Sequence, residues 1–212
     1  MIETPLDKLI HKRRSIRKYT QEQPPEGYIK KMILAAMKAP SPTNSQPVRF
    51  IRILSPELME QLHQTMEYGR ESLLEAIKDA PSSKRLKNWV NAYFRFSEFM
   101  FKAPVLFAVG TTSTFVSLSE RLFRAGMREQ GHKKYRDVDI SVGLALKGYL
   151  LKGEELGLGS CILTAPLIFI EKPETIFPLK GIEIKCFVTT GYPDEEPDYI
   201  KRKDFDEIYR EL

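Results

Sequence analysis

The sequence contains few of the residues that metal centres and disulfide frameworks require. Its 212 residues include two cysteines and three histidines. Cys161 and Cys186 have neither Cys-x-x-Cys nor metal-ligand spacing. The histidines, His11, His63 and His132, lack the His-x-x-x-His spacing of zinc enzymes. We therefore predict no metal site, and we expect both cysteines to be buried as small hydrophobic residues in a reducing compartment.

Long hydrophobic runs and targeting signals are also absent. The longest apolar candidate, Ala103 to Gly110, has the length of a strand, whereas a membrane-spanning helix needs about 20 apolar residues. The first residues lack the basic region and apolar run of a secretory signal. We therefore predict a cytoplasmic protein with no membrane partner, in which Ala103 to Gly110 is a central strand covered on both faces.

Several nucleotide-binding and catalytic motifs are missing as well. No Gly-x-x-x-x-Gly-Lys-Ser/Thr loop exists for a nucleoside triphosphate. Gly157-Leu158-Gly159 begins like a dinucleotide fingerprint, but Ile162 stands where the third glycine belongs and the pair follows a predicted helix. The Ser-x-x-Lys match at Ser15 lacks the companion motifs of penicillin-interacting enzymes. The sequence thus argues against all three classes.

The overall composition is that of an ordinary globular protein. Hydrophobic residues make up 42% and charged residues 29%, which suits a single domain over residues 1–212. The 33 basic and 28 acidic residues give a net charge of +5. This excess suits an anionic ligand but is well short of the bias of nucleic-acid-binding proteins, so we predict no nucleic-acid partner.

The apolar pattern predicts mainly helices, with strands between them. Helices are expected after Thr4, from Pro25 to Ala39, from Ser55 to about Tyr68, in one or two parts of 70–100, and from Asp139 to Leu156. Further strands are expected at Val48–Leu54 and Ile182–Thr190. Within 70–100, the spacing predicts five core residues: Trp89, Val90, Tyr93, Phe96 and Met100.

The helix from Asp139 to Leu156 is apolar nearly all round. A helix with so little polar surface must be covered on most sides. It is therefore either the central core helix or part of an oligomer interface.

The segment Arg13-Arg14-Ser15-Ile16-Arg17 is where we expect the functional site to be built. In an extended backbone, Arg13, Ser15 and Arg17 point to one side, and the other two residues point away. Guanidinium groups bind phosphate bidentately, and a serine hydroxyl can donate a further hydrogen bond. The pattern is typical of a site for a phosphorylated ligand, although a solvated basic turn after a short helix has the same composition.

A second candidate segment follows at residues 39–50, with the sequence APSPTNSQPVRF. Its three prolines stiffen the chain and cannot continue a helix. The amide and hydroxyl side chains between them remain free to hydrogen-bond a planar polar ring.

Together these segments resemble the RRSxR element and the APSxxNxQPxxF loop of the FMN-dependent nitroreductase family. Residues 156–166, LGLGSCILTAP, are similar to the family signature LGLGSCWxTGP, with Ile162 in place of the aromatic residue and Ala165 in place of glycine. Residues 191–193 match the GYP that ends a strand in the family, and Lys201 and Arg202 resemble its C-terminal basic element. These signatures occur in the family order and cover nearly the whole chain.

The resemblance implies an α+β fold, a three-layer α/β/α sandwich with a mixed, mostly antiparallel central sheet, in an intertwined homodimer. It implies bound FMN near the interface. The residues implied to bind it are Arg13, Arg14, Ser15, Arg17, Pro40, Ser41, Pro42, Asn44, Gln46, Ile162, Leu163, Thr164, Ala165, Lys201 and Arg202.

The implied roles differ between these groups. Arg17 or Arg13 would lie near flavin N1 and the C2 carbonyl, whereas Arg14, Ser15 and Arg202 would hold the phosphate. A backbone N–H of Thr164 or Ala165 would donate to flavin N5. Pro40, Ser41, Pro42 and Asn44 would serve the FMN bound mainly by the partner subunit.

The implied activity is reduction of a nitroaromatic, a quinone or a related small acceptor by NAD(P)H in a ping-pong cycle. The flavin supplies the chemistry, so no catalytic side chain is predicted. Residues 113–137 vary in the family and border the substrate pocket, so a cationic lid and a solvated helix with its loop both remain open. Two other functions also stay open: a flavin store or sensor without turnover, and a basic nucleic-acid or acidic-partner module built on residues 84–95 and 121–136.

Overall fold

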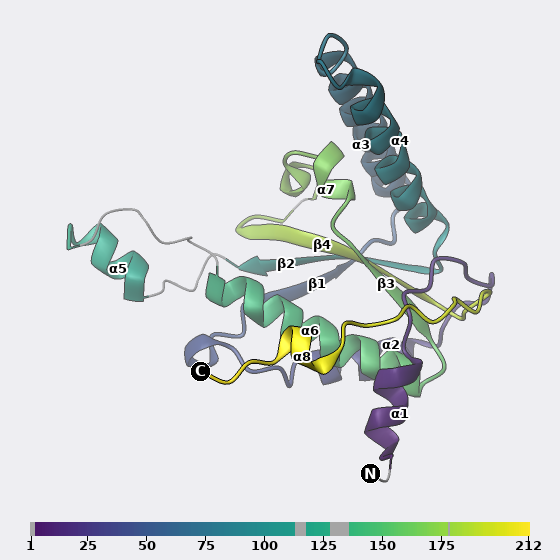
Figure 1. Ribbon diagram of the computed structural model, residues 1–212, viewed down its shortest axis with the longest axis vertical. Coiled ribbons are helices and arrows are strands. Elements are labelled where there is room, and N and C mark those ends of the chain that lie inside the picture. The colour runs from purple at the N-terminus through teal and green to yellow at the C-terminus, as the bar shows by residue number, and fades with distance from the viewer. Residues whose placement is uncertain (1–2, 113–117, 128–135, 178) are drawn as a thin grey trace.

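The computed structural model describes residues 3–112, 118–127, 136–177 and 179–212. Its centre is a sheet with the strand order β1-β2-β4-β3, in which every neighbouring pair is antiparallel (Figure 1). The strands are β1 (Val48–Arg52), β2 (Val105–Thr112), β3 (Gly159–Leu163) and β4 (Ile182–Gly191). Beyond β3, Ser15 forms a parallel bridge to Ser160, so the N-terminal segment extends the sheet. The predicted α+β fold with a mostly antiparallel sheet is confirmed.

Helices cover both faces of this sheet. On one face lie α3 (Pro56–Ala76), α4 (Ser83–Glu98) and α7 (Pro166–Phe169), and on the other lie α2 (Glu26–Ala36) and α6 (Arg136–Glu155). Successive residues of β2 enter the two cores in turn, with Leu106 and Ala108 on the α3 side and Phe107 and Val109 on the α6 side. The expectation of a central strand covered on both faces is therefore confirmed.

The remaining helical elements are short or peripheral. They are α1 (Pro5–Lys12), α5 (Leu118–Arg124), α8 (Phe205–Ile208) and the 3₁₀ turns η1 (Pro42–Asn44), η2 (Phe99–Lys102) and η3 (Pro173–Thr175). Helix α1 begins as predicted, because Thr4 and Asp7 form a capping box and Pro5 occupies the first turn.

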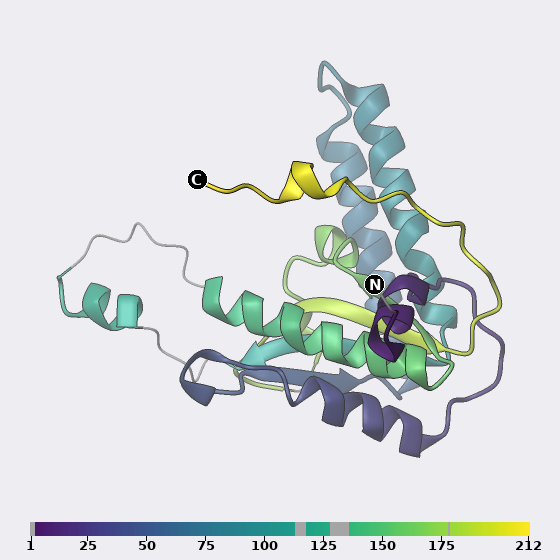
Figure 2. The ribbon, with the colours of Figure 1, turned by 60° about the horizontal axis from the view of Figure 1, so that its bottom comes forward.

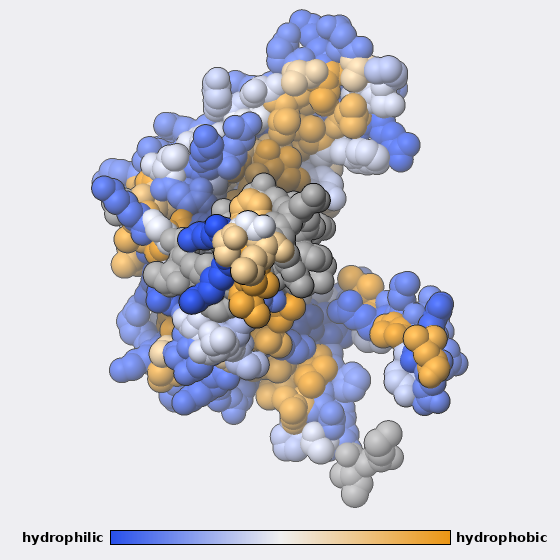
Figure 3. Space-filling view, turned by 90° about the vertical axis from the view of Figure 1, so that its left-hand side faces the viewer, coloured by the Kyte–Doolittle hydropathy of each residue, from blue (hydrophilic) through white to orange (hydrophobic). Residues whose placement is uncertain are grey.

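The prediction for residues 70–100 was wrong in part. Met100 is buried, but Trp89, Tyr93 and Phe96 are 51%, 51% and 65% exposed. Helices α3 and α4 form a hairpin that projects from the sheet, so α4 buries only the stripe that contains Phe94 (Figure 1). In the side view of Figure 3, hydrophobic residues gather along this projecting part of the molecule. Helical spacing identified apolar residues on this helix but could not tell which of its faces meets the core.

Helix α6 is a core helix on one side and keeps apolar residues exposed on the other. Tyr149, Leu146 and Val142 pack into the core beneath the sheet, whereas Ile140 and Leu144 are exposed on the opposite side. One chain therefore covers only part of the apolar surface of this helix.

The last residues form an arm that leaves the sheet after β4. From Asp198 to Leu212 every residue is exposed, and α8 stands away from the body of the molecule (Figure 2). Of the predicted lid at 113–137, residues 113–117 and 128–135 lie outside the described residues, and α5 occupies part of the rest. In the described ranges, no helix is both long enough and apolar enough to cross a bilayer. Both cysteines are free and buried, as expected.

Candidate functional site

Residues 13–17, the arginine segment, lie along the free edge of β3. The backbone N–H of Ile16 donates to the carbonyl of Ser160 at 3.2 Å, next to the Ser15–Ser160 bridge. Gly159 allows this close approach, because a Cβ atom there would lie 2.4 Å from Ile16 Cγ1. The extended backbone assumed from the sequence is thus produced by pairing with β3.

Arg13, Ser15 and Arg17 all act on the side chain of Cys161. Burial raises the pKa of the Cys161 thiol, and the positive charges of Arg17 and Arg13 and a hydrogen bond with Ser15 oppose that rise. These three side chains therefore all lie close enough to Cys161 to affect its thiol.

Arg14 points elsewhere. Its Nη1 atom donates to the carbonyls of His11 and Arg13 at the end of α1, and its guanidinium lies 5.3 Å from the ring centroid of Tyr199. This side chain caps a helix and contacts the arm, so its predicted contact with phosphate stays a prediction.

Arg202, near the C-terminus, lies close enough to Arg13 for their charges to interact. Burial lowers the pKa of Arg13, and the neighbouring charges of Arg202 and Arg14 lower it further, against a smaller opposing effect of Glu154. Clustered cations with too few carboxylates repel one another, and a bound anion relieves that repulsion. Lys201 instead pairs with Asp204 at 3.7 Å. Arg13 and Arg202 are thus the pair best suited to a phosphate.

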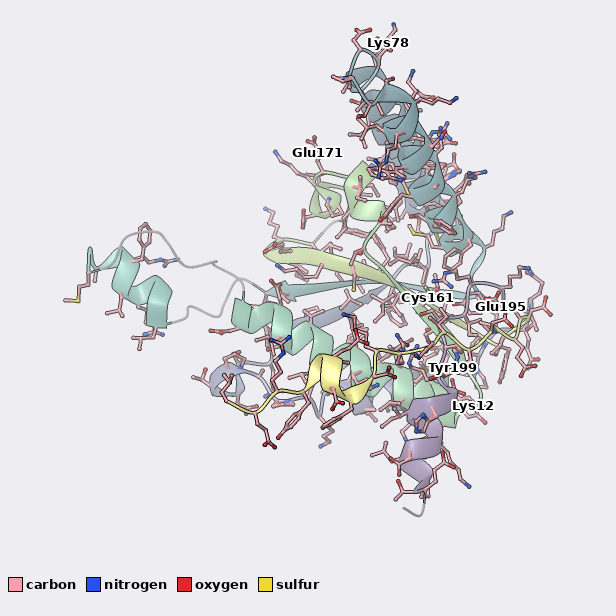
Figure 4. All side chains as sticks on the ribbon, in the orientation of Figure 1. Lys12, Lys78, Cys161, Glu171, Glu195 and Tyr199 are labelled. Carbon is pink, nitrogen blue, oxygen red and sulfur yellow. The ribbon has the colours of Figure 1, made fainter. Side chains whose placement is uncertain are left out.

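The sequence did not reveal the groups that hold this segment. The Glu195 carboxylate accepts the backbone N–H groups of Arg17 and Lys18, the latter at 3.0 Å, and the Tyr19 hydroxyl donates to the carbonyl of Ile16. Figure 4 shows Glu195, Cys161 and Tyr199 together near the end of α1. Glu195 follows the predicted GYP strand end, but no short motif links it to residues 177 or 178 positions away.

The proline-rich loop has an unusual backbone. Thr43, Asn44 and Gln46 have φ angles of 51°, 55° and 45°, in the left-handed region that residues other than glycine seldom occupy. The Ser41 hydroxyl accepts the Gln46 N–H at 2.9 Å, and Gln46 Nε2 donates to Asn44 Oδ1 at 3.3 Å. Such strain persists where surrounding contacts enforce it, and it is common at ligand-binding sites. Pro40 and Pro42 flank Ser41 and restrict the chain there.

The loop and the arginine segment lie at opposite ends of the sheet. The loop leads into Val48, which pairs with Thr111, whereas Gly159 pairs with Gly191 beside the start of β2. The length of β2 separates these ends by about 23 Å at the usual rise of a strand. Figures 1 and 2 both show this separation. One chain does not bring the two predicted halves of the site together.

The turn after β3 lies between these ends. Ile162 is exposed at the sheet edge, and Leu163 is buried. The carbonyls of Thr164 and Ala165 accept the N–H groups of Leu167 and Ile168 at 3.0 Å, which starts α7. Within the described residues, no group of three or more His, Cys, Asp and Glu side chains could hold a metal ion.

Comparison with known proteins gives consistent matches. The model of the Nitroreductase family matches residues 10–192. An iodotyrosine deiodinase of Thermotoga neapolitana is 28% identical over 195 residues, 90% of each chain. YfhC of Bacillus subtilis (strain 168), a candidate NAD(P)H nitroreductase, is 26% identical over 207 residues, 96% of this chain and 92% of its own.

Two solved structures resemble the whole chain. A BluB-like flavoprotein of Clostridium difficile 630 has a TM-score of 0.79 at 25% identity and covers 99% of both chains. An oxidised iodotyrosine deiodinase bound to FMN and 3-iodo-L-tyrosine has a TM-score of 0.66 at 25% identity, over 94% of this chain and 96% of that chain.

Proposed function

Because the chain belongs to the Nitroreductase family, we propose that it is an FMN-dependent oxidoreductase that uses NAD(P)H to reduce a small acceptor such as a nitroaromatic or a quinone. The observation that carries this proposal is the cation cluster of Arg13 and Arg202, in which burial of Arg13 lowers its pKa and the neighbouring charge of Arg202 lowers it further, so that a bound anion would stabilise both charges. The phosphate of FMN has the charge and the oxygen geometry that two guanidinium groups bind.

When bound, FMN supplies the two-electron chemistry, accepting hydride equivalents from NAD(P)H and delivering them to the acceptor in turn. The chain's own part is to bind and orient the cofactor. Arg13, Arg202 and Ser15 would hold the phosphate, and the positive charge of Arg17 would stabilise negative charge that develops on the reduced flavin. The N–H groups of Thr164 and Ala165 are the donors proposed for N5.

We further propose that the working molecule is a homodimer. The loop with Ser41 and Asn44 lies about 23 Å from the arginine segment of its own chain, so a single chain offers half a site at each place. Leu34 and Met37 of α2 are exposed, as are Ile140 and Leu144 of α6, which packs on α2. A second copy that covers this apolar surface can bring its loop to the arginine segment.

A visible spectrum and a turnover assay test the proposal together. We expect the purified protein, after incubation with FMN and desalting, to retain flavin absorbance. We also expect menadione or nitrofurazone to stimulate its oxidation of NADPH or NADH. Retained flavin without any stimulated oxidation would favour a flavin store or sensor, and absence of retained flavin would refute the proposal.

A second acceptor class follows from the comparisons. A 28% identical relative is an iodotyrosine deiodinase. We propose 3-iodo-L-tyrosine as a further acceptor to test in the same assay, with release of iodide as the measured product. The cytoplasmic location and the single domain over residues 1–212 stay predictions.

A further inference from the structure

Two adjacent threonines at the end of β4 are buried on opposite faces of the sheet. Thr189 and Thr190 are both fully buried, and consecutive strand residues point to opposite sides. A valine would fill either position without a hydroxyl group to satisfy. Buried hydroxyls in a strand therefore call for a reason beyond packing.

On the α6 side, Thr190 joins a chain of three hydroxyls. Its Oγ1 atom lies 2.9 Å from the hydroxyl of Tyr149 and 2.9 Å from Oγ of Ser160. Burial raises the pKa of the Tyr149 hydroxyl far above its ordinary value, so this group keeps its proton. The carbonyl of Ser160 accepts the backbone N–H of Ile16. The chain thus links α6 and β4 to the arginine segment.

On the opposite face of the sheet, Thr189 makes a second connection to Ile16. Its Oγ1 atom lies 2.8 Å from the hydroxyl of Tyr19, and that hydroxyl donates to the carbonyl of Ile16. Burial also raises the pKa of Tyr19, which therefore remains a donor. Both backbone groups of Ile16, its N–H and its C=O, are held by residues connected to the threonine pair.

Ile16 lies between Ser15 and Arg17, so fixing its two peptide groups fixes the direction of both neighbouring side chains. Its own side chain is buried against Gly159 and cannot rotate into a different register without a clash. The side chains proposed to bind phosphate are themselves partly or wholly exposed, so their order has to come from the backbone beneath them.

We propose that Thr189 and Thr190 are positioning residues that hold Ser15, and through the same backbone segment Arg13, toward the phosphate of FMN. This inference rests on the proposed function. The hydrogen bonds of the two threonine hydroxyls are proposed to orient the residues that bind the phosphate. Removing either hydroxyl should therefore weaken binding of the phosphate more than binding of the flavin ring.

The test compares FMN with riboflavin, which lacks the phosphate, as ligands of the apoprotein. We expect Thr189→Val and Thr190→Val each to raise the Kd for FMN by about 3- to 10-fold, the equivalent of one hydrogen bond, with less change for riboflavin. Thr190→Ser keeps the hydroxyl and should restore the wild-type preference for FMN. Flavin fluorescence quenching gives both dissociation constants.

Two further variants distinguish a specific effect on phosphate binding from a general loss of stability. Ser97→Ala removes a fully buried hydroxyl that donates to the carbonyl of Tyr93, so the hydrogen bond that it breaks lies within α4 itself. It should lower the melting temperature and leave the FMN-to-riboflavin ratio unchanged. Tyr19→Phe keeps the ring and removes only the hydroxyl, so it tests the Thr189 connection even if Thr189→Val does not fold.

The outcomes separate this inference from the proposed function. Wild-type protein that binds FMN, together with valine and phenylalanine variants that keep the wild-type ratio, would overturn the positioning role alone. Wild-type protein that binds no FMN would overturn both. A selective loss of FMN affinity that Thr190→Ser repairs would support both.

Discussion

The composite site makes a prediction that a site within one chain does not: two inactive variants should restore activity in each other. The first variant carries Arg13→Gln and Arg202→Gln in the cation cluster. The second carries Ser41→Ala and Asn44→Gly in the loop, where glycine keeps the positive φ of residue 44 without its amide group. In a mixed dimer, one site receives both lesions and the other receives none.

The structure sets the expected size of the effect. The two segments lie about 23 Å apart in one chain, so neither lesion reaches the other segment directly. Loss of two charge-assisted contacts should raise the Kd for FMN in the first variant at least about 100-fold. Random pairing in a C₂ dimer makes about half of the dimers mixed, so about one quarter of all sites should be intact before purification and about half of the sites in purified mixed dimers.

The assay measures FMN bound per chain and NADPH oxidation with menadione after co-expression of two differently tagged variants and purification through both tags in sequence. Each variant mixed with wild type is the control for dimer formation. Doubly tagged dimers that are isolated in good yield yet bind no FMN would refute the composite site, because they would contain both intact halves on the required chains.

Three other predictions follow from single residues. Gly159→Ala places a Cβ atom 2.4 Å from Ile16 Cγ1 and should cost about 1–3 kcal/mol of stability and most FMN binding, whereas Gly27→Ala, with nothing within 4 Å, should be neutral or stabilising in urea unfolding. Arg13→Gln should weaken FMN binding about 10- to 100-fold. Arg14→Gln, which loses a helix cap, should lower the melting temperature with little effect on the Kd for FMN. Equal effects of the two substitutions on that Kd would contradict the assignment of Arg13, and not Arg14, to the phosphate. Burial raises the pKa of the Cys186 thiol to about 12, against about 8.5 in the unfolded chain. The stability that the buried, protonated thiol contributes to the fold is therefore fully present below pH 8.5 and is lost as the pH rises from there to 12. Cys186→Val should therefore lose less stability than wild type between pH 8.5 and 10, by up to about 1.4 kcal/mol per pH unit in urea titrations at each pH, and parallel curves would show that the thiol does not titrate this way.

The part of the site that could be predicted from sequence is local. Arg13, Ser15 and Arg17 are expected on one side because an extended backbone alternates, and that rule needs no knowledge of tertiary structure; all three do act on Cys161. The stiff loop could likewise be predicted from its prolines, although its left-handed residues could not, because Thr43 and Gln46 have no intrinsic preference for that region.

The part that could not be predicted depends on contacts between distant residues. Tyr19 meets Thr189 across 170 positions, and Glu195 reaches the backbone of Arg17 from the far end of the chain. No short motif encodes such pairs. The exposure of Trp89 was missed for a related reason, since the direction in which the α3–α4 hairpin leaves the sheet is a property of the whole fold.

A site shared between two chains couples cofactor binding to assembly. If the arginine segment of one subunit and the loop of the other both contact FMN, the cofactor binds the dimer more tightly than the monomer. Linkage then requires FMN to tighten dimerisation by the same factor. In the proposed dimer, the exposed apolar residues Ile140 and Leu144 would provide association energy that does not depend on FMN, whereas the strained loop would gain its partner only in the complete site. The dissociation constant of the dimer should therefore fall when FMN is added, and riboflavin, which lacks the phosphate that Arg13 and Arg202 grip, should lower it less.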